Sequence, residues 1–178
     1  MSILGVEEGV EVSVSRDSRS CDAPDEVLGV SAAVPAWDTT LWLVGAHGGA
    51  GESRLAELDP RWLAAGHGWP PADERATAVV VARSDERGLR AAQRAARQWA
   101  SGLVPGVRLA GLVVMADAPG RLPRPLRELA DRVAGAFEAC WRVPWIGAWR
   151  TGDVADVPAL ARIVAALNEL PEQEMRRA

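Results

Sequence analysis

The chain has 178 residues, of which 48% are hydrophobic, and carries a formal net charge of −4 at pH 7. That length suffices for one domain with a hydrophobic core. The net negative charge argues against non-specific binding to nucleic acid or to an anionic membrane. The two cysteines, Cys21 and Cys140, lie far apart and outside any cysteine–histidine cluster, which argues against a disulfide framework or a zinc site.

The rest of the composition predicts a cytoplasmic bacterial protein. No apolar run approaches the ~20 residues of a membrane span, and the chain does not open with a basic stretch followed by an apolar one. We therefore expect neither a membrane helix nor a secretory signal. All 20 basic residues are arginines and alanine is abundant, which is typical of a GC-rich bacterial genome.

Composition divides the chain into three segments. We expect a flexible leader over residues 1–36, one folded domain over residues 37–170 and a charged tail over residues 171–178. The leader is small, acidic and contains serine and proline. Valines alternate with other residues over positions 10–14, so an edge strand is the alternative to a flexible segment there.

A buried strand followed by a glycine-rich loop comes next. Leu41 to Val44 form an apolar run that stops at a glycine, which is typical of a strand buried on both faces of a parallel sheet. Gly45 to Ser53 resembles the phosphate-binding loop G-x-x-x-x-G-x-S, with one residue more between Gly45 and Gly51 than the motif has. In such loops backbone N–H groups approach an anion. The candidate ligand loop comprises Gly45, Ala46, His47, Gly48, Gly49, Ala50, Gly51, Glu52, Ser53 and Arg54.

Glu52 stands where this loop motif requires a lysine. That lysine supplies a cation to the β- and γ-phosphates, whereas a carboxylate repels an anion by on the order of 4 kcal/mol at 4 Å with an effective dielectric constant of 20. The chain contains no lysine that could take over this role. We therefore expect no catalytic residue, no metal ligand and no cofactor, with ATP and magnesium as the alternative.

The stretch HGGAGESR resembles the deviant loop K-G-G-x-G-K-[ST]-[ST] of the MinD/ParA family of P-loop ATPases. The resemblance places His47 at the signature lysine that reaches across the dimer, Glu52 at the phosphate lysine and Ser53 at the magnesium-binding hydroxyl. The family's glycines correspond to Gly48, Gly49 and Gly51. Both lysines are therefore lost. The loop GAHGGAGES also resembles that of a set of small actinobacterial proteins with no established activity.

The region after the loop is predicted to be short and helical. A first helix carries Leu55 and Leu58, and Asp59-Pro60 is typical of a helix cap, so a second short helix is expected over residues 61–65. A turn should follow at residues 67–71. The resemblance implies two further strands and an acidic segment here. Only a few residues separate the predicted turn from the next strand, so this segment is too short to hold them.

The next strand, Ala78 to Ala82, leads into a helix that should begin with Ser84 as its cap and run to about Trp99. One side of this helix carries a basic stripe at helical spacing, formed by Arg87, Arg90, Arg94 and Arg97. In the resembled family such patches bind DNA, which makes the stripe a candidate partner surface. A solvated helix face is the ordinary alternative.

A third strand, Leu109 to Ala116, ends at Asp117, for which three roles stay open. By the order of elements, the resemblance places Asp117 at a position that contacts the nucleotide base. By local pattern, the segment DAPG over residues 117–120 resembles the family's magnesium-binding D-x-P-x-G. Without a ligand, a strand-end aspartate caps the following turn.

The last part of the domain is predicted as a helix over about residues 125–140, a strand over residues 143–149 and a helix over residues 157–170. Trp145 and Trp149 would share one face of that strand. Large indoles on such a face are a candidate partner surface, and core packing against a helix is the alternative.

Together these elements predict an α/β fold with three layers, in which helices flank a doubly wound, mostly parallel sheet, as in a reduced P-loop NTPase. We expect a degenerate MinD/ParA-like protein without ATP hydrolysis that acts as a protein-binding or scaffold module. One alternative is a nucleotide-binding switch or ATPase in which Arg54 or a partner's arginine compensates for Glu52. A second alternative is a sensor that binds a non-phosphate ligand at the same loop. The protein partner of the module is unidentified, and a second copy of the chain, in a homodimer, is one candidate.

Overall fold

We analysed a computed structural model of the chain. It describes residues 27–71, 75–152 and 158–175. The valine alternation near the N-terminus and Cys21 lie outside these residues. No helix in the described ranges is long and apolar enough to cross a membrane.

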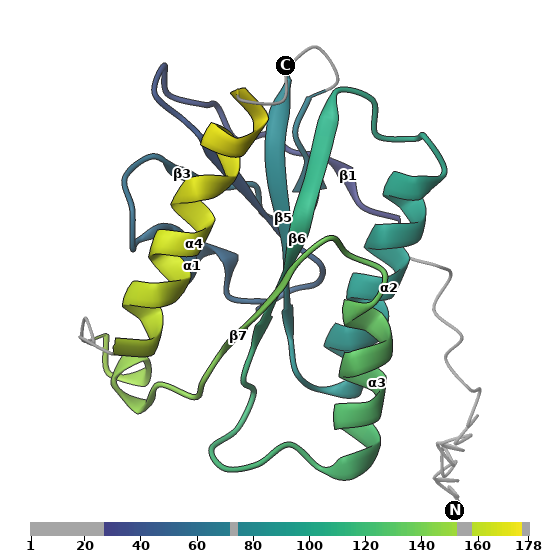
Figure 1. The fold of residues 1–178 in the computed structure, drawn as a ribbon, viewed down its shortest axis with the longest axis vertical. Helices are drawn as coiled ribbons and strands as arrows, with labels where there is room; N and C mark the ends of the chain where they lie inside the picture. The colour runs from purple at the N-terminus through teal and green to yellow at the C-terminus, as the bar shows by residue number, and fades with distance from the viewer. Residues whose placement is uncertain (1–26, 72–74, 153–157, 176–178) are drawn as a thin grey trace, which may run out of the picture.

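A sheet of five parallel strands forms the middle layer of the fold, in the order β3-β2-β5-β6-β7. Its strands are β2 (Leu41–Gly45), β3 (Trp62–Ala64), β5 (Ala76–Arg83), β6 (Val107–Met115) and β7 (Cys140–Val143). One face is covered by α2 (Glu86–Ala100) and α3 (Arg124–Ala134), and the other by α1 (Glu52–Ala56) and α4 (Pro158–Met175), as Figure 1 shows. The predicted α/β class with a mostly parallel, helix-flanked sheet is confirmed.

The strand order reverses at β2. From β2 the chain first forms β3 at one edge of the sheet and then crosses to β5 on the other side of β2. Numbered along the chain, the sheet has the doubly wound order 2-1-3-4-5, and in such folds ligands bind outside the carboxyl ends of the strands where the order reverses. Here these ends are Gly45 of β2 and Arg83 of β5, and β2 pairs with β5 up to Gly45 opposite Val81.

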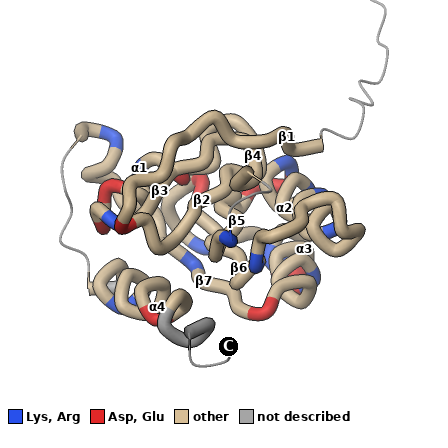
Figure 2. The backbone as a smooth tube through the Cα atoms, turned by 90° about the horizontal axis from the view of Figure 1, so that it is seen from above, with Lys and Arg blue, Asp and Glu red and all other residues tan. Residues whose placement is uncertain are grey.

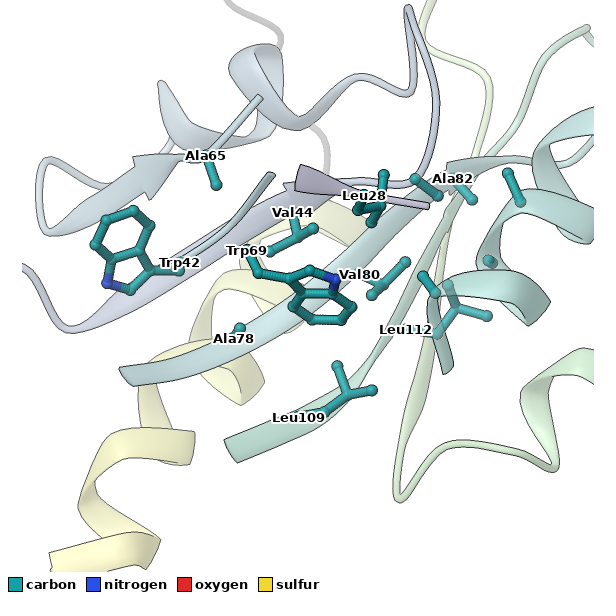
Figure 3. Packing of buried hydrophobic residues seen from close by; sticks show 14 of the residues in the cluster. Leu28, Trp42, Val44, Ala65, Trp69, Ala78, Val80, Ala82, Leu109 and Leu112 are labelled. Atoms are coloured by element: carbon teal, nitrogen blue, oxygen red, sulfur yellow. The ribbon is translucent and has the colours of Figure 1, made fainter. Parts of the chain in front are cut away.

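The apolar runs are buried because both faces of the sheet are covered. Trp42 and Val44 of β2 pack in the cluster beneath α2 and α3, which Figure 3 shows together with Val80 and Leu109. Leu43, which alternates with them, packs in a second cluster beneath α1 and α4. A fully buried side chain of this size contributes roughly 1.5–3 kcal/mol relative to an exposed one, so these runs stabilise the sheet on both sides.

The helix predicted over residues 61–65 is wrong, because that segment contains the edge strand β3. The side chain of Asp59 accepts a hydrogen bond from the backbone N–H of Arg61 at 2.9 Å, which forms a turn instead of a helix cap. Trp62, Leu63 and Ala64 then pair in parallel with β2. An Asp-Pro pair is found at the start of turns as well as of helices. Here the pairing of residues 62–64 with β2 decides for a turn followed by a strand.

Ordered structure begins before the predicted domain boundary at residue 36. Gly29–Val30 forms β1, which pairs in parallel with β4 (Gly68–Trp69) inside the predicted turn. Leu28 is buried in the core, and the Ser31 hydroxyl donates to the carbonyl of Ala65 at 2.8 Å. This part of the predicted leader is therefore packed on the domain.

The predicted bounds near the C-terminus also change. Helix α3 ends at Ala134, six residues before the predicted end at Cys140, which instead begins β7. The strand predicted over residues 143–149 is wrong, because β7 ends at Val143 and Pro144 has no N–H to extend a ladder. A 3₁₀ turn, η1 (Gly147–Arg150), follows.

Candidate functional site

The glycine loop lies between the end of β2 and the start of α1, where the strand order reverses. Gly49 and Gly51 have φ values of +76° and +103°. Only glycine adopts this left-handed region without strain, so both positions need glycine to turn the chain sharply into α1. The predicted sequence of strand, glycine turn and helix is present, although α1 is only five residues long.

Glu52 is turned into the base of the loop. Its side chain is buried, at 7% exposed, and a Cβ atom placed on Gly45 would lie 2.8 Å from its Cδ. Within the described residues, its Oε2 atom has no hydrogen-bond partner. Glycine at position 45 therefore makes room for the carboxyl group. Burying a carboxylate without a partner is costly, so this residue works against stability.

His47 is held within the chain and does not project from it. The residue is 8% exposed, its Nε2 accepts from the backbone N–H of Arg83 at 3.1 Å, and its Nδ1 lies 2.9 Å from the carbonyl oxygen of Gly48. Because Nε2 accepts, we assign the proton to Nδ1, which donates to Gly48. A side chain so placed cannot reach a second subunit, which differs from the position implied by the resemblance.

Arg83 brings a cation to the loop. The sequence placed it at a strand end that should converge with the loop, but the predicted ligand and partner-surface residues did not include it. Its Nε donates to the carbonyl of Gly49 at 3.0 Å and its Nη1 donates to the carbonyl of Ala116 at 3.1 Å. The guanidinium thus links the loop to the end of β6, and it forms no ion pair with Glu52. Its position as the first charged residue after the buried run of β5 was the available signal.

Arg54 points away from the base of the loop. Its Nη1 pairs with Glu57 at 2.5 Å, and its Nη2 lies 3.5 Å from the carbonyl oxygen of Trp149. Ser53, the predicted magnesium ligand, is exposed. In the described ranges no three His, Cys, Asp or Glu side chains are grouped to hold a metal ion.

Asp117 is engaged with Ser84 at the ends of β6 and β5. The Ser84 hydroxyl donates to the Asp117 carboxylate and accepts from the Asp117 backbone N–H at 3.1 Å. Ser84 is therefore not the cap of α2 as predicted. Asp85 caps that helix, because its carboxylate accepts from the N–H of Gly88 at 2.6 Å. This contact joins the ends of two neighbouring strands, 33 positions apart in the chain, and does not distinguish among the three roles predicted for Asp117.

Two cavities open at this edge of the sheet. The larger, of about 390 Å³, lies between the ends of the strands and α3, and its walls include Asp117, Pro119 and Leu126. The smaller, of about 140 Å³, is lined by Arg54, Arg83, Arg150, Trp145 and Trp149, among others, and we call it the arginine cavity. The two tryptophans are half-buried there, with Arg150 stacked on Trp145 at 5.7 Å from the ring centroid.

The basic stripe of α2 is not part of this site. Arg87, Arg90 and Arg97 are exposed, Arg94 is half-buried, and Arg90 pairs with Glu86 at 2.8 Å. Figure 2 shows basic positions on α2 together with acidic positions on neighbouring elements. The stripe is a surface feature of the helix that covers the other side of the sheet.

Comparison with known proteins gives one match. Residues 39–166 match a family described as a family of unknown function (DUF6668). The match runs from just before β2 into α4 and so contains the glycine loop, Arg83 and both cavities. No curated protein and no solved structure matches the chain.

Proposed function

The chain belongs to the family DUF6668, whose function is unknown, and we propose that it is a degenerate MinD/ParA-like protein that acts as a cytoplasmic binding module without ATP hydrolysis. The observation that carries this proposal is the position of Glu52. Its carboxyl group lies buried in the base of the glycine loop against Gly45, and within the described residues its Oε2 atom has no hydrogen-bond partner. A negative charge there repels a triphosphate instead of attracting it.

The other parts of the loop support the same proposal. Phosphoryl transfer depends on a cation clamp, a bound metal and a group that positions the nucleophile. His47 replaces one family lysine and is locked between Gly48 and Arg83, and Arg54 is directed to the carbonyl oxygen of Trp149, away from the base of the loop. A protein partner is the ligand we propose for such a module, because a fold can be kept while the function of its site changes.

The test is calorimetry with ATP and magnesium on the wild type and on the Glu52→Ala and Glu52→Lys variants. We expect no binding heat for the wild type and no hydrolysis by any of the three. Glu57→Ala is the matched control, because Glu57 directly follows the same helix and is exposed. Hydrolysis by the wild type, or its appearance in Glu52→Lys, would contradict the proposal.

A second candidate function is a nucleotide-binding switch that uses Arg83 as the missing cation. The observation that favours it is the hydrogen bond from Arg83 to Gly49 within the loop, which puts a guanidinium next to the expected phosphate position. This candidate predicts micromolar binding of ATP by the wild type and loss of that binding in Arg83→Gln. Absence of binding by the wild type would exclude it.

A further inference from the structure

We propose that the arginine cavity binds the phosphate group of a small phosphate monoester. This cavity is separate from the base of the glycine loop, because Glu52 and Gly45 do not line it. The inference therefore does not require that the loop itself bind nucleotide. It rests on the charge, the rigidity and the size of the cavity, which are independent of one another.

Among the described residues, the cavity lining carries three positive charges and no negative one. Arg54, Arg83 and Arg150 line it, and none of the other lining residues in the described part of the chain is acidic. Glu57, the ion-pair partner of Arg54, is exposed and lies outside the lining. Like charges that converge in a partly desolvated space repel one another, and an anion among them removes that repulsion. A neutral or cationic ligand would gain nothing from this arrangement.

Each guanidinium is held in place by a contact of its own. Arg54 is directed to the carbonyl oxygen of Trp149, Arg83 donates to that of Ala116, and Arg150 stacks on the indole of Trp145. After these contacts, each guanidinium group still has N–H groups that can donate hydrogen bonds to a ligand. Prepositioned guanidinium groups lose little side-chain freedom when an oxyanion binds, which favours binding.

The number of guanidinium groups and the volume of the cavity favour a phosphate over a carboxylate as the ligand. A carboxylate has two oxygens that one guanidinium can satisfy, whereas a phosphate monoester presents three charged oxygens and nearly two negative charges at pH 7. The volume of about 140 Å³ holds several water molecules at roughly 10–15 Å³ each, so a tetrahedral oxyanion fits. The indoles of Trp145 and Trp149 supply an apolar wall for the organic part of the ester.

The test is a titration of the full chain with phenyl phosphate, inorganic phosphate and acetate at constant ionic strength. Binding is measured by calorimetry and by the shifts of the NMR signals of the tryptophan indole N–H groups. We expect phenyl phosphate to bind more tightly than inorganic phosphate, and acetate to bind at least about tenfold more weakly than either. Arg54→Gln and Arg150→Gln should each weaken phosphate binding about tenfold, because each removes a charge-assisted hydrogen bond.

Arg97→Gln is the matched control, because it removes the same charge from an exposed position in the last turn of α2 that does not line the cavity. It should leave phosphate affinity unchanged. Phosphate binding without hydrolysis of ATP satisfies both proposals, whereas hydrolysis of ATP contradicts only the proposed function of the loop, so the two can fail separately. Equal weakening in Arg97→Gln, equal binding of acetate and phosphate, or absence of phosphate binding by the wild type would each overturn the proposal. Thermal unfolding of every variant verifies that it is folded.

Discussion

Two buried carboxylates flank the short helix α1, and they differ in what surrounds them. Glu52 begins the helix and Asp59 follows it, and they are 7% and 8% exposed. Both Asp59 oxygens accept hydrogen bonds from the Arg61 side chain, at 3.0 and 2.9 Å, and one also accepts from Asn168 at 2.9 Å. One oxygen of Glu52, by contrast, has no partner in the described part of the chain.

The surroundings explain why one acid has a structural role. The Arg61 hydrogen bonds are the main reason why the pKa of Asp59 lies well below its usual range, although burial alone would raise it. Asn168 in turn accepts from the indole N–H of Trp62 at 2.8 Å, so the network joins α4 to the edge strand β3. Burial of a charge is therefore no functional signal by itself. A buried charge without a partner, as at Glu52, is the informative case.

The largest expected effect is that of Asp59→Ala. This change removes the acceptor for Arg61 and Asn168, and we expect the free energy of unfolding to fall by about 2 kcal/mol. Urea unfolding measures it. The control is Asp131→Ala, which breaks an exposed ion pair with Arg142 and should cost less than about 1 kcal/mol. Equal losses for the two variants would show that the Asp59 network contributes no more than a surface pair.

A smaller effect concerns the dependence of stability on pH. The pKa of Asp59 is lowered in the folded state, so its contribution is complete above the unfolded pKa of about 3.9 and is lost as the pH falls below that value. In Asp59→Asn that loss cannot occur. We therefore expect the free energy of unfolding to fall less steeply between about pH 4 and pH 2 in the variant than in the wild type. Parallel curves from urea unfolding would contradict the assigned hydrogen bonds.

The smallest expected effect is that of Glu52→Gln, and its sign is opposite. An amide costs less to bury than an unpaired carboxylate, so the free energy of unfolding should rise by about 1 kcal/mol. Thermal unfolding should show a midpoint higher by roughly 2–4 °C for a chain of this length. Glu57→Gln, at an exposed position, should change little. A loss of stability in Glu52→Gln would mean that Glu52 is as well satisfied as Asp59, and the contrast between the two acids would fail.

Much of the fold could be predicted because its central strands are buried on both faces. The runs at Leu41 to Val44, Ala78 to Ala82 and Leu109 to Ala116 contain no polar side chain, and all lie in strands of the sheet except Ala116, which follows the end of β6. The edge strand β3 has only three residues and follows an Asp-Pro pair, so its local signal matched a helix equally well. Strand β7 likewise ends at Val143, just before Pro144, whereas the spacing of Trp145 and Trp149 predicted that the strand would continue to residue 149.

By itself the sequence determined the α/β class, the glycine loop and the replacement of its lysine by Glu52, because these depend on residue types at fixed spacing along a short stretch. Tertiary structure alone decided which partners the charged residues meet. Asp59 meets Asn168 across 109 positions, and Arg83 meets Gly49 across 34, because strands and helices distant in the chain pack side by side. A charge has a structural or a functional role according to those neighbours, and a local pattern does not contain them.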